Sequence, residues 1–201
     1  MLLPAFILTF KLQITIPILK YIALLLLLLS FYNGFGQDGL LPLDKDKNVY
    51  YADLGKVEKP RAAIYKSVQN WISATFGNYE NAVKQDDPQA GMLVLSSYVP
   101  VSGSSYEYVR FNLAIDCEDN RYQARIDRLD GISRLHSPER LGIKNNDLVT
   151  AKEQAVKTEN NRKNRAEAEE ALKTAKADND AVNAAMFKLL ASLKQAITAG
   201  E

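Results

Sequence analysis

The sequence of 201 residues has little of the residue types that carry most protein chemistry. It contains a single cysteine, Cys117, so no disulfide can form within the chain. It contains a single histidine, His136, which excludes a metal site built from several imidazoles. Cys117 ends an apolar set of strand positions and His136 falls in a loop-like stretch, which does not favour a catalytic pair. We interpret Cys117 as a small buried hydrophobic residue.

An excess of one charge and the common catalytic motifs are lacking as well. The formal net charge is +1, which gives no general support for nucleic acid or an anionic membrane as a partner. We find no glycine-rich phosphate loop, no spaced set of metal ligands and no nucleophile elbow. We therefore assign no catalytic, cofactor-binding or metal-binding residue and expect no cofactor.

Residues 1–36 have the composition of a targeting segment. Two lysines precede the apolar run 21–29, which has the length of a signal-peptide core and is shorter than a membrane span. Gly34 and Gly36 fit the small-x-small rule, so we expect a signal peptide cleaved after Gly36 and export to the periplasm or the exterior. The mature chain would then have no membrane segment. The alternative is an uncleaved segment that anchors the protein in the inner membrane.

The clearest helix of the sequence spans residues 59–77. Its large apolar residues recur at helical spacing and form one stripe: Ile64, Val68, Trp71, Ile72 and Phe76. Pro60 suits a helix start, and Gly77 suits the left-handed position that ends a helix. Trp71 could stack on a ligand, but at this place in the stripe we expect it to anchor the core against a sheet.

After a polar leader over 37–47, strand patterns surround this helix. Alternation is strongest in a hairpin, where Val109, Phe111 and Leu113 face one way and Tyr122 and Ile126 return on the same side. One buried face is typical of an antiparallel sheet covered on one side by a helix. The fold class is therefore α+β, with a domain over 48–131. Strands are expected at 48–53, 79–86 (weakly), 91–100, 106–118 and 121–127.

The hairpin and the helix together resemble a known family. Tyr65 and Trp71 in the helix, the run YVRFNLAIDCEDNRYQARI over 108–126 and the signal peptide are similar to a domain of unknown function in exported bacterial proteins. That family is described as having a fold like the TATA-box-binding protein. The resemblance covers about residues 45–135. It implies a curved antiparallel sheet in the order β-α-β-β-β-β, and it brings no established activity or functional residue.

The fold name suggests nucleic-acid binding, but the residues argue against it. The DNA-binding protein uses a basic saddle of two tandem copies with aromatic wedges, and only one copy is visible here. On the open face Arg110, Arg121 and Arg125 alternate with Asp116 and Asp127. Such a mixed face is usually solvated and joined by cross-strand ion pairs. We expect no nucleic-acid partner.

The C-terminal third predicts a connector over 132–147 and one long helix over 148–199. The segment 137–140 has a helix-start pattern and is expected to form a helical turn. Residues 168–197 follow a heptad, with Asn179 at a core position where it would specify a parallel dimer. The alternative is a helix that docks on its own domain or on a partner. The core positions are Leu172, Asn179, Met186 and Leu193 at a, with Ala168, Ala175, Val182, Leu189 and Ala196 at d.

These observations favour a noncatalytic exported envelope protein that binds or scaffolds through the sheet face or the C-terminal helix. Its partner would be another protein or a second copy joined through 168–197. The alternative is an enzyme of unknown type or a loose cation binder that uses the acidic hairpin end. That end comprises Asp116, Glu118 and Asp119, with Asp127 and Asp130 nearby.

Overall fold

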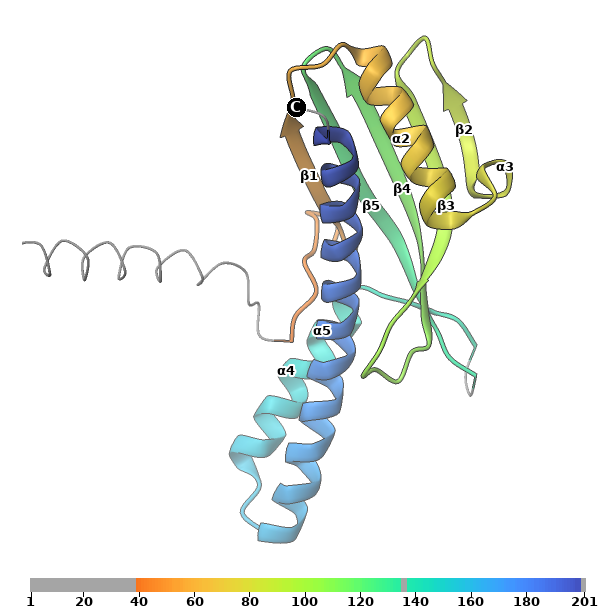
Figure 1. Ribbon diagram of the computed structural model, residues 1–201. Coiled ribbons are helices and arrows are strands. Elements are labelled where there is room, and N and C mark those ends of the chain that lie inside the picture. Colours follow the sequence, from red (N-terminus) through yellow and green to blue (C-terminus); the bar gives the residue numbers. More distant parts are fainter. Residues whose placement is uncertain (1–38, 135–136, 200–201) are drawn as a thin grey trace, which may run out of the picture. The chain divides into compact units, whose positions relative to one another are not determined.

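The computed structural model describes residues 39–134 and 137–199, so the expected signal peptide and His136 lie outside it. The described chain contains four helices and a sheet of six strands (Figure 1). The strands are β1 Tyr51–Lys56, β2 Val83–Asp87, β3 Met92–Pro100, β4 Tyr108–Glu118, β5 Arg121–Ile132 and β6 Glu139–Arg140. The helices are α2 Arg61–Phe76, α3 Tyr79–Ala82, α4 Ile143–Thr158 and α5 Arg162–Thr198.

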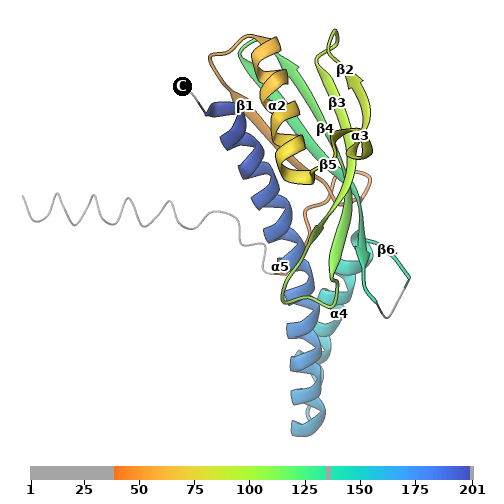
Figure 2. The same cartoon turned by 45° about the vertical axis from the view of Figure 1, so that its right-hand side comes forward.

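The sheet is antiparallel throughout, in the order β1-β5-β4-β3-β2. The short β6 pairs with β5 at Asp130 and Gly131, beyond the stretch that β1 occupies (Figure 2). One face of β4 and β5 is buried at the alternating positions that the sequence predicts, among them Phe111, Leu113 and Ile126. The expected α+β fold is confirmed.

Helix α2 lies on this buried face, as the apolar stripe predicts. Ile64, Val68 and Ile72 are fully buried, and Trp71 is 6% exposed. The helix starts directly after Pro60 and ends before Gly77, whose φ of 78° lies in the region that favours glycine. The expectation that Trp71 is a core residue is confirmed.

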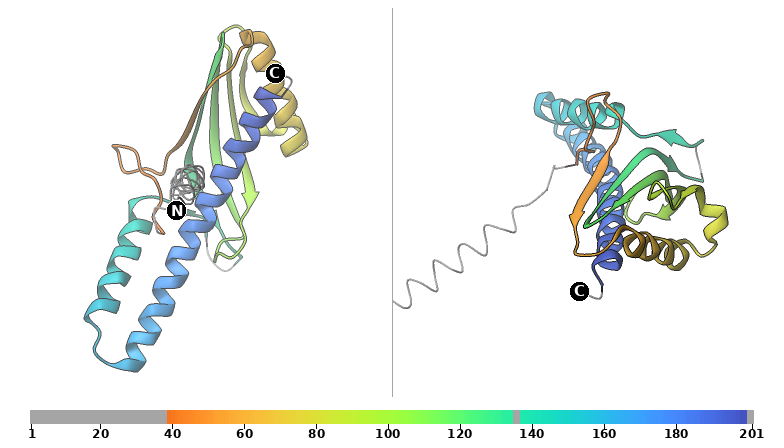
Figure 3. Two further views of the ribbon diagram at one scale, coloured as in Figure 1. Left: turned by 60° about the vertical axis from the view of Figure 1, so that its left-hand side comes forward. Right: turned by 90° about the horizontal axis from the view of Figure 1, so that it is seen from above.

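A second helix covers the same face, which corrects the expectation of one packed helix. The C-terminal half of α5 lies beside α2 on the sheet (Figures 1 and 3). The ammonium of Lys59 holds the end of α5 by donating to the carbonyl oxygens of Ile197 (2.6 Å) and Ala199 (2.7 Å). These carbonyls have no partner within the helix, and a cation also suits the helix C-terminus. The residues of α5 that join the core are Val182, Met186, Leu189, Leu190, Leu193 and Ile197.

The single helix expected over 148–199 is two helices. Helix α4 ends at Thr158, and α5 begins after Asn161, whose side chain accepts from the backbone N–H groups of Lys163 and Asn164. Asparagine at this place stabilises a new helix start, and this explains the break. The two helices form a hairpin (Figure 3), and Lys176 of α5 forms an ion pair with Glu153 of α4 at 2.9 Å.

Most of the heptad positions of α5 are buried by the chain itself. Asn179 is 2% exposed and donates to the carbonyl of Gly39 at 2.7 Å. Asn183, one turn later, donates to the carbonyl of Leu40, and Asn146 of α4 both donates to and accepts from the backbone of Leu41. We call residues 39–41 the N-terminal strap. The alternative of a helix docked on its own domain therefore describes α5.

Two short segments differ from expectation. The weak strand at 79–86 begins as α3, capped by Asn78, whose side chain accepts from the N–H of Asn81, and becomes a strand only at Val83. In place of the helical turn expected over 137–140, Glu139 and Arg140 form β6 and pair with β5, and Arg140 also donates to the carboxylate of Asp130. No helix in the described part of the chain is long and apolar enough to cross a membrane.

Candidate functional site

The acidic residues of the β4–β5 hairpin do not assemble into a cation site. Asp116 forms an ion pair with Arg125 at 3.3 Å, and Glu118 forms one with Arg121. Asp119 accepts from the backbone N–H of Arg61 at 2.7 Å and so caps α2. Across residues 39–134 and 137–199 no group of three or more acidic, histidine or cysteine side chains could hold a metal ion.

Asp130 is separate from this hairpin end and is buried between two guanidinium groups. Its exposed fraction is 6%. Arg110 donates to one carboxylate oxygen through Nε (3.0 Å) and Nη2 (2.8 Å), and Arg140 donates to the other at 2.6 Å. Charge-assisted bonds of this kind fix the position of both arginines. Two cations share one anion, so the cluster keeps one positive charge.

Cys117 is 1% exposed, and burial raises the pKa of its thiol to about 12. A thiol becomes a good nucleophile when its pKa is lowered, so this environment opposes catalysis. The structure thus agrees with the interpretation of Cys117 as a core residue.

A cleft of about 440 Å³ lies at the edge of the sheet. It lies where β2 has stopped pairing with β3 and α3 crosses to the end of α2. Arg110 is the one charged residue that lines it. The other lining residues are Thr75, Phe76, Asn78, Asn81, Ala82, Ser96, Ser97 and Tyr98.

The cleft exposes one edge of β3. β2 pairs with β3 only as far as Leu95, and β4 pairs with the full length of β3 on the other side. Beyond Leu95 no strand in the described chain pairs with the outer edge of β3. A strand edge left open in this way presents backbone N–H and C=O groups to solvent.

Two hydrogen bonds establish which residues present these groups. The N–H of Cys117 donates to the carbonyl of Gly91 (2.8 Å), and the N–H of Val101 donates to the carbonyl of Glu107 (3.0 Å). Backbone groups of successive strand residues point to opposite sides. Odd-numbered residues of β3 therefore bond to β4, and the N–H and C=O of Tyr98 point outward.

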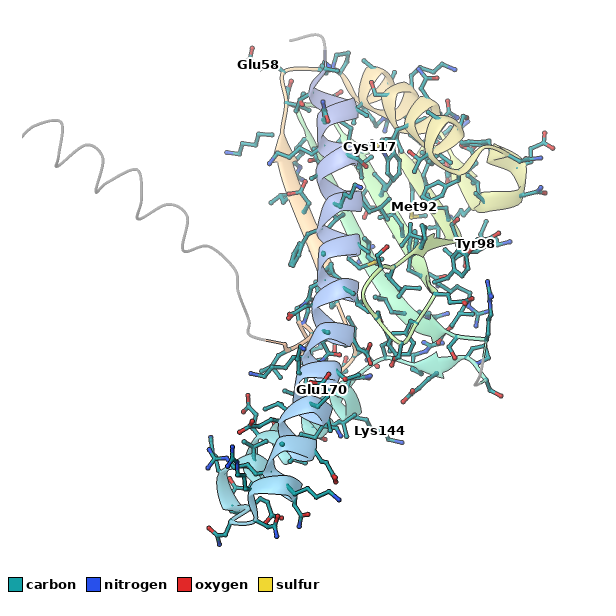
Figure 4. The ribbon with its side chains drawn as sticks, turned by 60° about the horizontal axis from the view of Figure 1, so that its bottom comes forward. Glu58, Met92, Tyr98, Cys117, Lys144 and Glu170 are labelled. Carbon is teal, nitrogen blue, oxygen red and sulfur yellow. The ribbon has the colours of Figure 1, made fainter. Side chains whose placement is uncertain are left out.

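The side chain of Tyr98 adds an aromatic surface beside the cleft. It is 63% exposed, lies at the periphery of the sheet on the same strand as Met92 (Figure 4), and meets Tyr108 edge to face at a centroid distance of 5.7 Å. Tyr98 is also the cross-strand partner of Arg110. An exposed aromatic pair next to a fixed cation is suited to binding rather than to bond-breaking chemistry.

The wall of the cleft opposite β3 is held in place by a carboxylate. Asp86 of β2 accepts hydrogen bonds from the hydroxyls of Tyr65 on α2 and Tyr79 on α3. Burial, with help from the bond to Asp86, raises the pKa of Tyr79 to about 12, so its hydroxyl stays protonated and can donate. These bonds join α2, α3 and β2 next to the cleft.

Sequence reasoning placed Arg110 on a solvated face and did not single out Tyr98 or Tyr108. The run MLVLSS is apolar at both alternating phases, so it does not show which side of β3 is buried. A signal was present, since Tyr98 has the opposite parity to Leu93 and Leu95. That signal becomes readable only once the pairing of β3 with β4 is known.

A family model and one solved structure support the fold. Residues 50–130 match the family model of a domain of unknown function (DUF4468) with TBP-like fold. A crystal structure of a TBP-like protein from Parabacteroides distasonis aligns with a TM-score of 0.56 and 16% identity, over 80% of this chain and 98% of that one. A DUF4468 family protein from Bacteroides ovatus aligns with a TM-score of 0.41 and 14% identity, over 50% and 64%. No curated protein matches.

Proposed function

Since residues 50–130 match a domain of unknown function with TBP-like fold, we propose that this chain is a noncatalytic binding protein and that its binding site is the cleft beside β3. The observation that carries the proposal is the cleft itself, with Arg110 and the exposed Tyr98 at its side. Pockets of this size with a few fixed polar groups are the usual places for ligands. The lining residues offer amides, hydroxyls and a guanidinium, and include no carboxylate, histidine or cysteine.

The same proposal places the protein in the cell envelope, exported by the signal peptide expected over 1–36. Cell fractionation tests the location, and mass spectrometry of the purified protein tests cleavage. We expect a mature chain that begins at Gln37. If the protein keeps Met1 and fractionates with the inner membrane, the segment is uncleaved and anchors the protein there, and export is wrong.

A nucleic-acid partner is not part of this proposal. On the open sheet face Arg121 and Arg125 are paired one to one with Glu118 and Asp116, and Arg110 shares Asp130 with Arg140, so these pairs leave one surplus positive charge. Binding to a phosphate backbone draws on several cations that release counterions, and one surplus charge does not supply them.

Site-specific photocrosslinking in intact cells tests the cleft. A photoreactive phenylalanine analogue replaces Tyr98 in one strain and Leu148 of α4 in another, because both side chains are at least half exposed and lie on different elements. We expect a discrete crosslinked partner from position 98 and none from position 148. Equal products at both positions would mean random collision and would end the proposal.

A second candidate surface is the C-terminal helix, through a protein partner or self-association over 168–197. Phe187 supports it, because the residue is 45% exposed although its ring contacts Tyr51 edge to face at 5.3 Å. Most of the heptad positions, however, are already buried in the chain itself. The photoreactive analogue at position 187 tests this surface in the same experiment. A partner captured there and not at position 98 would move the binding site to α5.

A further inference from the structure

The open edge of β3 suggests the class of ligand that the cleft receives. We infer that the partner binds as an extended, acidic polypeptide segment that adds to β3 as a strand, in line with β2. This inference rests on the proposed function, since it names the ligand of the same cleft. Its test below separates failure of the binding site from failure of the binding mode.

The outer edge of β3 presents backbone groups with which an added strand can pair. The N–H and C=O of Tyr98 and the C=O of Pro100 point away from β4, as the alternation along β3 requires. An extended peptide offers complementary groups at the same repeat, and main-chain bonds of this kind give affinity in strand addition. A compact small molecule would satisfy one or two of them at most.

The length of the open sheet edge limits how long a segment can bind there. β2 ends its pairing at Leu95 because the chain before Val83 turns into α3. β2 therefore occupies the outer edge of β3 from Met92 to Leu95, and this edge is open at Tyr98. The open stretch is bounded by the end of α2 on one side and by Pro100 at its far end, so it admits a short segment of a few residues rather than a whole strand.

The positive charge at Arg110 favours an acidic ligand. Arg110 is the one charged residue that lines the cleft, and its anion Asp130 is shared with Arg140. The surplus positive charge favours an occupant with a carboxylate side chain near Arg110. The rings of Tyr98 and Tyr108 can cover an apolar side chain on the same face of the added strand.

A random peptide library displayed on phage is the probe, with the purified mature chain as bait. We expect selected peptides to be rich in Asp and Glu and in residues of high β-propensity, and their affinity to fall as salt is raised. Selection of basic peptides, or of none, would overturn the inference. The crosslinking experiment at position 98 would still test the proposed function.

Matched substitutions at one residue separate backbone from side chain. Tyr98→Ala removes the ring and keeps the outward N–H, whereas Tyr98→Pro also removes that N–H. Proline is tolerated at a strand edge whose N–H faces solvent, so both variants should fold, as thermal melting will show. We expect Tyr98→Pro to bind the selected peptide about tenfold more weakly than Tyr98→Ala, the cost of a backbone bond.

Other outcomes are equally decisive. Equal binding by the two variants, together with loss of binding in Arg110→Gln, would keep the cleft as the binding site and refute strand addition. Concentration-dependent dimers that Tyr98→Pro abolishes would show that a second copy occupies the edge. If Tyr98→Pro does not fold, a scan of backbone N-methylation along the peptide replaces it. Strand addition requires loss of binding at every second position, and a uniform response would refute it.

Discussion

The indole Nε1 of Trp71 donates a hydrogen bond to the hydroxyl of Ser192 at 3.1 Å, and this bond joins α2 to α5. The two residues are far apart in the sequence, and the bond gives the one polar atom of a buried indole its partner. The ring also meets Phe76 edge to face at 5.6 Å, and Phe76 leads on to Phe111 of the sheet at 6.2 Å. Trp71 is thus the point where both helices and the sheet meet.

Replacing Trp71 tests this arrangement. We expect Trp71→Ala to lower the free energy of unfolding by about 3–5 kcal/mol, because it leaves a large cavity between two helices. Ser192→Ala should cost about 1 kcal/mol, because the indole N–H loses its acceptor. Urea unfolding measures both, and Tyr98→Ala, an exposed aromatic, is the control with little change. A loss below about 1 kcal/mol in Trp71→Ala would contradict a core role.

Asn179 distinguishes the strap from a coiled coil. In this structure its amide serves the carbonyl of Gly39, so Asn179→Leu should destabilise the chain by about 1–3 kcal/mol by leaving that carbonyl buried and unpaired. In a parallel dimer the same substitution would raise stability and relax the oligomeric state. Urea unfolding and analytical sedimentation read the two effects, with Asn164→Ala, at an exposed position, as control. A more stable, more oligomeric Asn179→Leu would favour the coiled coil.

The thiol of Cys117 gives a pH dependence. Burial raises its pKa from the ordinary 9.0 to about 12, so the folded state holds this proton more tightly than the unfolded state does. The resulting stabilisation is complete below pH 9 and is lost as the pH rises toward 12. We expect the free energy of unfolding to fall over this range, and to fall less steeply in Cys117→Ala. Identical slopes for the two proteins would place the thiol in contact with water.

Asp119 tests the role of the acidic hairpin end. Asp119→Ala should cost about 1 kcal/mol, because the first N–H of α2 loses its acceptor, and Asp119→Asn should cost less because it keeps an oxygen there. Calorimetric melting with and without calcium is the measurement, and we expect calcium to leave the wild-type transition unchanged. A calcium-dependent rise that Asp119→Asn removes would restore the cation-binding alternative.

Local pattern was sufficient for the parts of this protein whose faces differ clearly in polarity. The stripe of α2 and the alternation of β4 and β5 each leave one way to bury their apolar residues, so the helix, the hairpin and the role of Trp71 could be predicted. The cleft could not be predicted in the same way, because its residues come from α2, α3, β3 and β4 and none is unusual in its own segment.

The sequence by itself determined an α+β fold built on an antiparallel hairpin and an apolar helix, because periodicity reports which side of an element avoids water. Only the tertiary structure decided what covers each apolar surface. The apolar heptad positions of α5 can pack against a second helix or against a sheet. The amide of Asn179 can pair across a dimer interface or with the backbone of Gly39, as it does here. The hydrophobic effect is non-directional, so an apolar stripe does not specify which surface covers it. The rest of the chain decides which surface that is.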